Sequence, residues 1–196
     1  MLTRREFLAC SALAVVPPPG PVRIVVRGNG AGSRGAALAL EEMRRTAALV
    51  RRAIDPAPHP DAIVVDTGAG TLTSGSETFH VAASDAARLQ AIDAFRLENP
   101  GSAPRDAIEW HPGLSRFGAE QLNTRYERRF GHGMTASEWI GWMAVKAAVD
   151  AQLRPVPLAR GRFDGHKGVA LYFGPDRHLV QPLCIVDAGG ALLGTS

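Results

Sequence analysis

The chain has 196 residues, of which 45% are hydrophobic and 21% charged. This length supports one packed domain and is too short for two large ones. The formal net charge of +3 is small, and the basic residues are scattered along the chain. Both observations argue against a nucleic-acid-binding protein. No apolar run is long enough for a membrane span, so we expect none after removal of a leader.

Residues 1–19 predict an export signal and a proline-rich spacer. The segment Thr3–Leu8 contains two adjacent arginines and is followed by an apolar run that ends at Val16, a pattern that resembles a twin-arginine signal. Small residues at Ala12–Ala14 offer a cleavage site. The alternative is a basic N-terminus before a short buried helix. We therefore expect a periplasmic protein whose folded domain spans residues 20–196.

Strands and helices alternate along the first half of this domain. The β-branched run Val22–Val26 predicts a buried strand, and the glycine-rich turn Gly28–Gly35 leads from it into a helix that ends near Ile54. Further strands are expected at Ala62–Val65, Thr78–Ala82 and Ala107–Trp110, with a loop over Gly68–Glu77 and a helix after the cap at Ser84 and Asp85. This alternation predicts a parallel sheet with helices packed on its faces.

The second half predicts a pair of helices and a closing hairpin. Apolar residues spaced by three and four between Ala119 and Phe130 indicate an amphipathic helix. Thr135 and Glu138 form a capping box for a second helix, which begins near Ala136 and is stopped by Pro155. The apolar runs Val169–Phe173 and Leu183–Val186 then predict a terminal hairpin or a strand that returns to the sheet.

Two stretches of sequence resemble a known family. FGAEQLNTRYERRFG, WIGWMAVKAAVDA and FDGHKGVALYFGPDRHLVQPL in the C-terminal half, with SRGAALALEEMRRTAAL near the N-terminus, are similar to type I periplasmic substrate-binding proteins of ABC transporters. The similarity is greatest to the subfamily associated with pyrroloquinoline quinone-dependent alcohol dehydrogenases. It implies an α/β fold: a three-layer sheet of mostly parallel strands with helices on both faces, here reduced to a single lobe with a C-terminal β-hairpin.

The resemblance implies an exported, non-catalytic solute-binding protein without a cofactor. Its partners would be a small-molecule ligand and either a transporter permease or a periplasmic quinoprotein dehydrogenase. Two lobes would need about twice this length, so an accessory protein that kept the scaffold and lost the ligand cleft is the alternative. A third alternative is an NAD(P)-dependent oxidoreductase, because Gly30, Gly32 and Gly35 match the GxGxxG fingerprint. Against it, Asp66 comes about ten residues too late for the ribose-binding acid.

Candidate ligand-binding residues follow from topology, since ligands of open parallel sheets bind beyond the carboxyl ends of the strands. Arg34 is suited to a carboxylate and Trp110 to stacking on a flat ligand. Each candidate also has a structural explanation, such as a helix cap at Ser84, a core position for Trp110 or a turn at His111. The sequence contains neither a nucleophile elbow nor metal-ligand spacing of its histidines. The eight candidates are Asn29, Ser33, Arg34, Asp66, Thr67, Ser84, Trp110 and His111.

Overall fold

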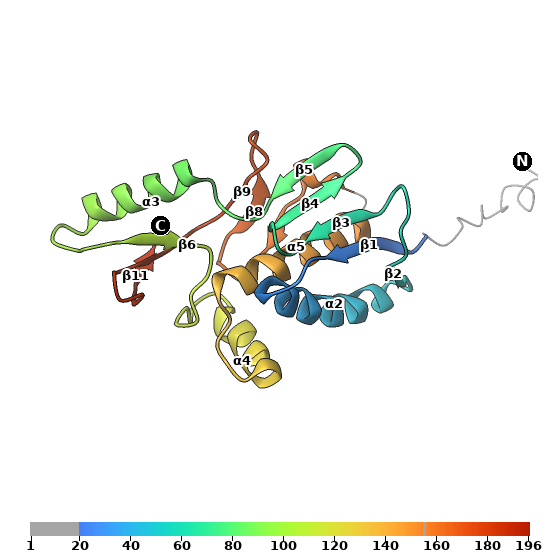
Figure 1. The fold of residues 1–196 in the computed structure, drawn as a ribbon, viewed down its shortest axis with the longest axis horizontal. Coiled ribbons are helices and arrows are strands. Elements are labelled where there is room, and N and C mark those ends of the chain that lie inside the picture. Colours follow the sequence, from blue (N-terminus) through green and yellow to red (C-terminus); the bar gives the residue numbers. More distant parts are fainter. Residues whose placement is uncertain (1–19, 155) are drawn as a thin grey trace, which may run out of the picture.

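The computed structural model describes residues 20–154 and 156–196, so the predicted export signal lies outside the described residues. The described helices are α2 (Ala31–Leu49), α3 (Asp85–Glu98), α4 (Ala119–Phe130) and α5 (Ala136–Leu153), with a 3₁₀ turn, η1, at Leu158–Arg160. The strands are β1 (Val22–Arg27), β2 (Ile54–Asp55), β3 (Ile63–Asp66), β4 (Thr71–Ser74), β5 (Glu77–His80), β6 (Asp106–Ile108), β7 (Phe163–Asp164), β8 (Ala170–Phe173), β9 (Leu179–Val180), β10 (Cys184–Val186) and β11 (Leu192–Thr195) (Figure 1).

The largest sheet is mixed, which corrects the expectation of mostly parallel strands. Its order is β2-β1-β3-β4-β5; β1 pairs in parallel with β2 and β3, whereas β3–β4 and β4–β5 are antiparallel. The expected loop Gly68–Glu77 contains β4, whose one buried residue is Leu72. Tight turns at Gly70 and Gly75, both with positive φ, connect these strands where a parallel sheet would need crossover helices.

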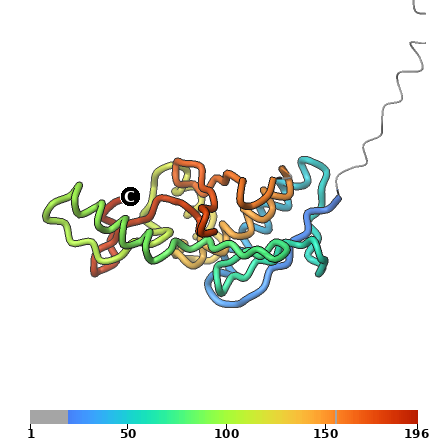
Figure 2. Tube along the Cα trace, turned by 90° about the horizontal axis from the view of Figure 1, so that it is seen from above, coloured from blue at the N-terminus to red at the C-terminus, as the bar shows by residue number. Residues whose placement is uncertain are grey.

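Helices cover one face of this sheet, so the observed arrangement has two layers where three were expected. Helix α5 contacts β1, β3 and β4, and α2 packs beside α5 and against β1 (Figures 1 and 2). Burial along β1 agrees with this, since Val22 and Ile24 are buried and the residues that alternate with them are partly exposed. The remaining long helix, α3, packs against β6 and β10 of another sheet.

Three glycines bring α2 and α5 into close contact. A Cβ atom at Gly35 would overlap the carbonyl oxygen of Glu138, and one at Gly141 would overlap that of Gly32. A Cβ at Gly32 would also meet the carbonyl oxygen of Thr67. Helix α2 begins at Ala31, so the expected glycine-rich turn ends earlier than predicted and Gly32 and Gly35 belong to the helix. Gly35 therefore allows α5 to approach α2, and Gly32 allows the turn after β3 to approach the start of α2.

The predicted helix pair is confirmed. Helix α4 buries Ala119, Leu122 and Tyr126 and ends at Gly131, which adopts the left-handed conformation. Helix α5 starts with the capping box, in which the Thr135 N–H donates to the Glu138 carboxylate at 2.8 Å. Apolar residues surround most of α5 because it is covered by the sheet on one side and by α2 on another.

A smaller unit, which we call the α3 unit, consists of α3 and the three-stranded sheet β11-β10-β6. Its own hydrophobic cluster is small and is separate from the main core; it comprises Ala83, Ala91, Ile92, Ala107, Leu183 and Ile185, with Phe95 packed against it. The α3 unit lies at one end of the elongated molecule in Figures 1 and 2, away from the large sheet.

The C-terminal strands pair differently from the prediction. Strand β8 forms its hairpin with β9, and not with Leu183–Val186. The latter segment contains β10, which pairs antiparallel with both β6 and β11. The turn between β10 and β11 makes the closing hairpin. Along β10 the side chains alternate, because Ile185 belongs to the α3 cluster and Cys184 to the main core.

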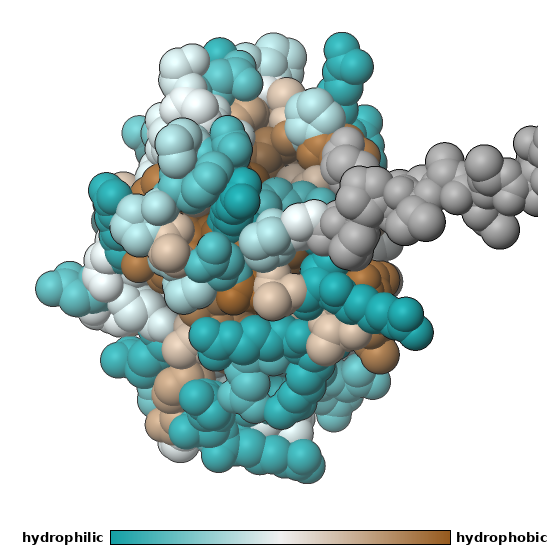
Figure 3. Space-filling view, turned by 90° about the vertical axis from the view of Figure 1, so that its right-hand side faces the viewer, coloured by the Kyte–Doolittle hydropathy of each residue, from teal (hydrophilic) through white to brown (hydrophobic). Residues whose placement is uncertain are grey.

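The end of the molecule opposite α3 has a mixed surface, with hydrophobic residues between hydrophilic ones (Figure 3). Exposed Leu49 and Val50 mark the end of α2. Within the described part of the chain, no helix has both the length and the hydrophobicity required to cross a bilayer.

Candidate functional site

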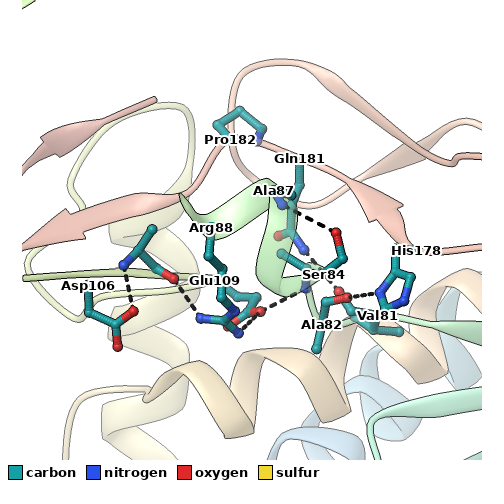
Figure 4. A network of polar contacts seen from close by, with 12 residues as sticks. Val81, Ala82, Ser84, Ala87, Arg88, Asp106, Glu109, His178, Gln181 and Pro182 are labelled. Carbon is teal, nitrogen blue, oxygen red and sulfur yellow. Dashed lines mark hydrogen bonds and ion pairs between the residues drawn. The ribbon is translucent and has the colours of Figure 1, made fainter. Parts of the chain in front are cut away.

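Three chain segments join the α3 unit to the main unit. Val81–Ser84 leads from β5 into α3, Glu109–His111 leads out of β6, and Gln181–Leu183 connects β9 to β10. They pass side by side because their backbone and side-chain groups bond to one another (Figure 4). We refer to this region as the junction.

The C-terminal segment is bonded to the first crossing segment. Gln181 donates from its side-chain amide to the Val81 carbonyl at 2.9 Å, and His178 Nδ1 lies 3.0 Å from the Ala82 carbonyl oxygen (Figure 4). A carbonyl oxygen can only accept, so Nδ1 carries the proton in this contact. The His178 ring also stacks on His80, with centroids 4.7 Å apart.

A buried ion pair joins the second crossing segment to α3. Glu109 is only 1% exposed, and its carboxylate accepts from the Ala83 N–H at 2.9 Å and from the Arg88 guanidinium (Figure 4). Arg88 donates in addition to the Ala107 carbonyl. A buried carboxylate needs such partners, because burying it without them would be very unfavourable.

Lys167 lies beneath the third crossing segment. Its side chain is 5% exposed; Nζ donates to Gln181 Oε1 at 2.6 Å and to the Pro182 carbonyl at 2.7 Å, and lies 4.2 Å from the Trp139 ring centre. Both hydrogen-bond acceptors are uncharged. Burial therefore lowers the pKa of the Lys167 ammonium to about 7, although Cys184 and Glu109 oppose the shift.

A groove of about 400 Å³ opens at the junction, between α3 and the C-terminal segment. Its apolar walls include Ala87, Ala91 and Ala94 from α3, and Leu179, Val180 and Leu183 opposite. The polar side chains along it are Ser84, Gln90, Asp176, His178, Gln181 and Ser196. An apolar concavity with a few polar groups has the character of a small-molecule site. We call it the junction groove.

Four of the sequence-predicted residues meet at one corner, after the carboxyl ends of β1 and β3. Asn29 is exposed in the turn before α2. Ser33 Oγ lies 3.1 Å from Thr67 Oγ1, and the Thr67 hydroxyl donates to the Arg27 carbonyl at 3.0 Å. Asp66 accepts from the N–H groups of the following turn. These contacts hold the turns together, and none of the four residues lines the junction groove.

Arg34 finds its carboxylate within the protein. Its Nε and Nη2 donate to Glu138 Oε1 at 2.9 and 2.7 Å, which ties α2 to the start of α5. The hydrogen bond with Glu138 raises the pKa of the Arg34 guanidinium. Burial disfavours the charged form of Glu138, but the Thr135 N–H and Arg34 outweigh it, so the pKa of this carboxyl is lowered.

The other three predicted residues are spread along the chain segments near the junction. Ser84 caps α3 by accepting from the Ala87 N–H at 3.3 Å and lines the groove. Trp110 is fully buried, stacks on Trp139 and donates to Asn123 Oδ1 at 2.9 Å. His111 accepts from the Gly113 N–H in a turn. Ser84 is therefore the one predicted residue that the structure places in the groove.

Sequence reasoning missed the polar groove residues of the C-terminal segment, chiefly Asp176, His178 and Gln181. The one local signal is that three consecutive polar residues, Asp176 to His178, follow the turn residues Gly174-Pro175, and this pattern indicates a turn and not a binding site. Among the described residues, no three His, Cys, Asp or Glu side chains are grouped as a metal site requires.

Comparison of the chain with protein-family models, curated proteins and solved structures finds no match.

Proposed function

We propose that this protein is a non-catalytic solute-binding protein that holds a small molecule in the junction groove. The observation that carries the proposal is the position of the groove, between two units with separate hydrophobic clusters that three chain segments connect. A ligand there would contact α3 on one side and the β8–β9 hairpin on the other. Closure of one unit toward the other would then enclose it.

The biological context that we propose comes from the sequence. The chain is exported through the arginine-containing leader to the periplasm, and delivers its ligand to a transporter permease or a quinoprotein dehydrogenase. It would be a reduced type I periplasmic-binding protein. Cell fractionation tests this part: replacing Arg4 and Arg5 together by lysine should leave the full chain in the cytoplasm, whereas unchanged export would contradict a twin-arginine leader.

Binding itself is tested by the thermal stability of the purified protein against a panel of small molecules. A ligand selective for the native state at a hundred times its dissociation constant adds about 2.7 kcal/mol to the free energy of unfolding. The matched variants are Ala87→Trp, which fills the groove, and Ala86→Trp, at a neighbouring exposed position outside it. A stabilising ligand should lose its effect with the first variant and keep it with the second.

A second candidate is an accessory protein that binds another macromolecule through the α3 unit. Exposed Leu89 and Leu97 on α3 favour it, since large apolar side chains on a helix surface are typical of contact sites. Replacing both by glutamine separates the candidates. Loss of a co-purifying protein without any loss of small-molecule binding would favour the accessory role. The nicotinamide alternative has less support, because the close approach of Thr67 accounts for Gly32 and the contact with α5 accounts for Gly35.

A further inference from the structure

The charges around the junction groove restrict its ligand. Among the lining residues, all of which belong to the described part of the chain, Asp176 is the one aspartate, and no glutamate, lysine or arginine lines the groove. Its Oδ1 accepts from the backbone N–H of His178 at 3.1 Å, and within residues 20–154 and 156–196 it forms no ion pair with a basic residue. The groove therefore presents a negative charge at its edge.

The basic side chains near the groove are engaged elsewhere. Arg88 pairs with Glu109, and Arg177 with Glu77 at 2.9 Å. Lys167 does not line the groove, and its Nζ donates to Gln181 Oε1. Asp85, in the first turn of α3, offsets the positive end of that helix. An anionic ligand would accordingly meet the Asp176 carboxylate, and no lysine or arginine is among the described residues that line the groove.

The uncharged polar groups can both accept and donate. His178 Nδ1 donates to Ala82, so Nε2 is left as the ring acceptor. The hydroxyls of Ser84 and Ser196 each accept from a backbone N–H, which leaves their hydrogens available to a ligand. Alanines of α3 form the wall beside these groups, and they can pack against an apolar body but cannot solvate a charge.

We infer that the junction groove binds a small molecule with an apolar body and a head group that donates a hydrogen bond and carries no negative charge. This inference rests on the proposed function, because it names the class of ligand for the same groove. It excludes carboxylic acids and other organic anions as ligands. The head group meets Asp176 and His178, and the apolar part lies along Ala87 and Ala91.

Four probes that share a phenyl ring test the inference on the full chain. Benzyl alcohol, benzamide, benzylamine and benzoate are titrated separately, and dissociation constants and perturbed amide signals are measured by NMR. Benzyl alcohol and benzamide should perturb signals of Ser84–Ala91 and His178–Gln181. Benzoate should bind at least about fivefold more weakly than benzyl alcohol, since about 1 kcal/mol is the repulsion of two charges at 4 Å in water.

Two variants test whether Asp176 causes the charge preference and whether the probes bind in the junction groove. Asp176→Asn should bring the affinity for benzoate close to that for benzyl alcohol and should weaken benzylamine by about fivefold. Ala87→Trp should abolish binding of all probes, with Ala86→Trp as the matched control that retains it.

The results separate failure of the inference from failure of the proposed function. If benzoate bound more tightly than benzyl alcohol, and Ala87→Trp abolished this binding, the inferred ligand class would be wrong. The groove would still be a solute-binding site. Perturbations at Gly28–Ser33 alone would move the site to the corner after β1 and overturn the inference. Binding of none of the probes would overturn it as well, and only an additional failure of the wider panel would overturn the proposed function.

Discussion

The main unit and the α3 unit are stabilised in different ways. In the main unit, α2 and α5 contact each other through glycines and cover the sheet with an extensive apolar core that includes three tryptophans. The α3 unit has a small cluster of its own and is held to the rest by the buried Arg88–Glu109 pair and by the bonds of the junction. Apolar packing therefore dominates the stability of the main unit. The placement of the α3 unit depends on polar contacts at the junction together with the packing of Cys184, Ile108 and Leu192 against the main core.

The largest effect is expected from Gly35→Leu in the main unit. Any side chain at this position would overlap the Glu138 carbonyl, so α2 and α5 would have to separate. We expect loss of folded protein, measured by circular dichroism and size-exclusion chromatography. Gly20→Leu is the control, since among the described residues no heavy atom beyond its chain neighbours lies within 4 Å of a Cβ at that position. Normal folding of Gly35→Leu would contradict the glycine-mediated contact.

Ile185→Ala should weaken the α3 unit selectively. Ile185 is fully buried in the small cluster, and truncation of such a residue lowers the free energy of unfolding by about 3 kcal/mol. Hydrogen exchange should accelerate in α3 and β6 and remain slow in β1 and β3. Equal acceleration of exchange in all four elements would show that the two units unfold together, and would contradict their being stabilised in different ways.

Glu109→Gln should lower the free energy of unfolding by about 2 kcal/mol, because it leaves Arg88 without its buried carboxylate. Urea unfolding measures the change. The matched control is Asp93→Asn, which breaks an exposed pair with Arg96 on the same helix and should cost below about 0.5 kcal/mol. Equal effects of the two substitutions would show that the Glu109 contact does not hold α3.

The smallest effect concerns the pH dependence that Lys167 confers. Its folded-state pKa of about 7 is below the model-peptide value, so between about pH 7 and 8.5 the unfolded chain binds more protons and stability should rise with pH. The slope from this one group is about 1 kcal/mol per pH unit. Lys167→Met should flatten it, whereas Lys146→Met, at a lysine paired with Asp150, should not. Parallel pH profiles for the wild type and Lys167→Met would contradict a depressed pKa.

Local sequence patterns predicted the helices better than the strand pairing. The capping box at Thr135 and the apolar spacing before Phe130 act within a few residues, and both helices form where they were expected. Strand β4 was missed because it contains a single apolar residue, Leu72, among small polar ones. The pairing of β8 with β9 depends on a turn of the chain, and apolar runs alone do not specify it.

The functional residues were harder to predict because the groove is made by distant segments. Ser84 and His178 are far apart in the sequence and meet only because the crossing segments lie side by side. Topology correctly suggested that polar groups gather after β1 and β3, but those of Ser33 and Thr67 bond to each other and to the backbone. Arg34 was expected to bind a carboxylate, and in the structure that carboxylate belongs to Glu138. Whether a ligand also uses this corner stays a prediction.

We expect a small molecule with an apolar body and an uncharged head group to bind between the two units, and hydrogen exchange of the full chain with and without saturating benzyl alcohol measures this binding. The amides in Ser84–Ala94 and His178–Leu183 should exchange more slowly when the probe is bound, with β1 and β3 unchanged. Protection confined to Gly28–Arg34 and Asp66–Ala69, or no protection in either unit, would contradict it.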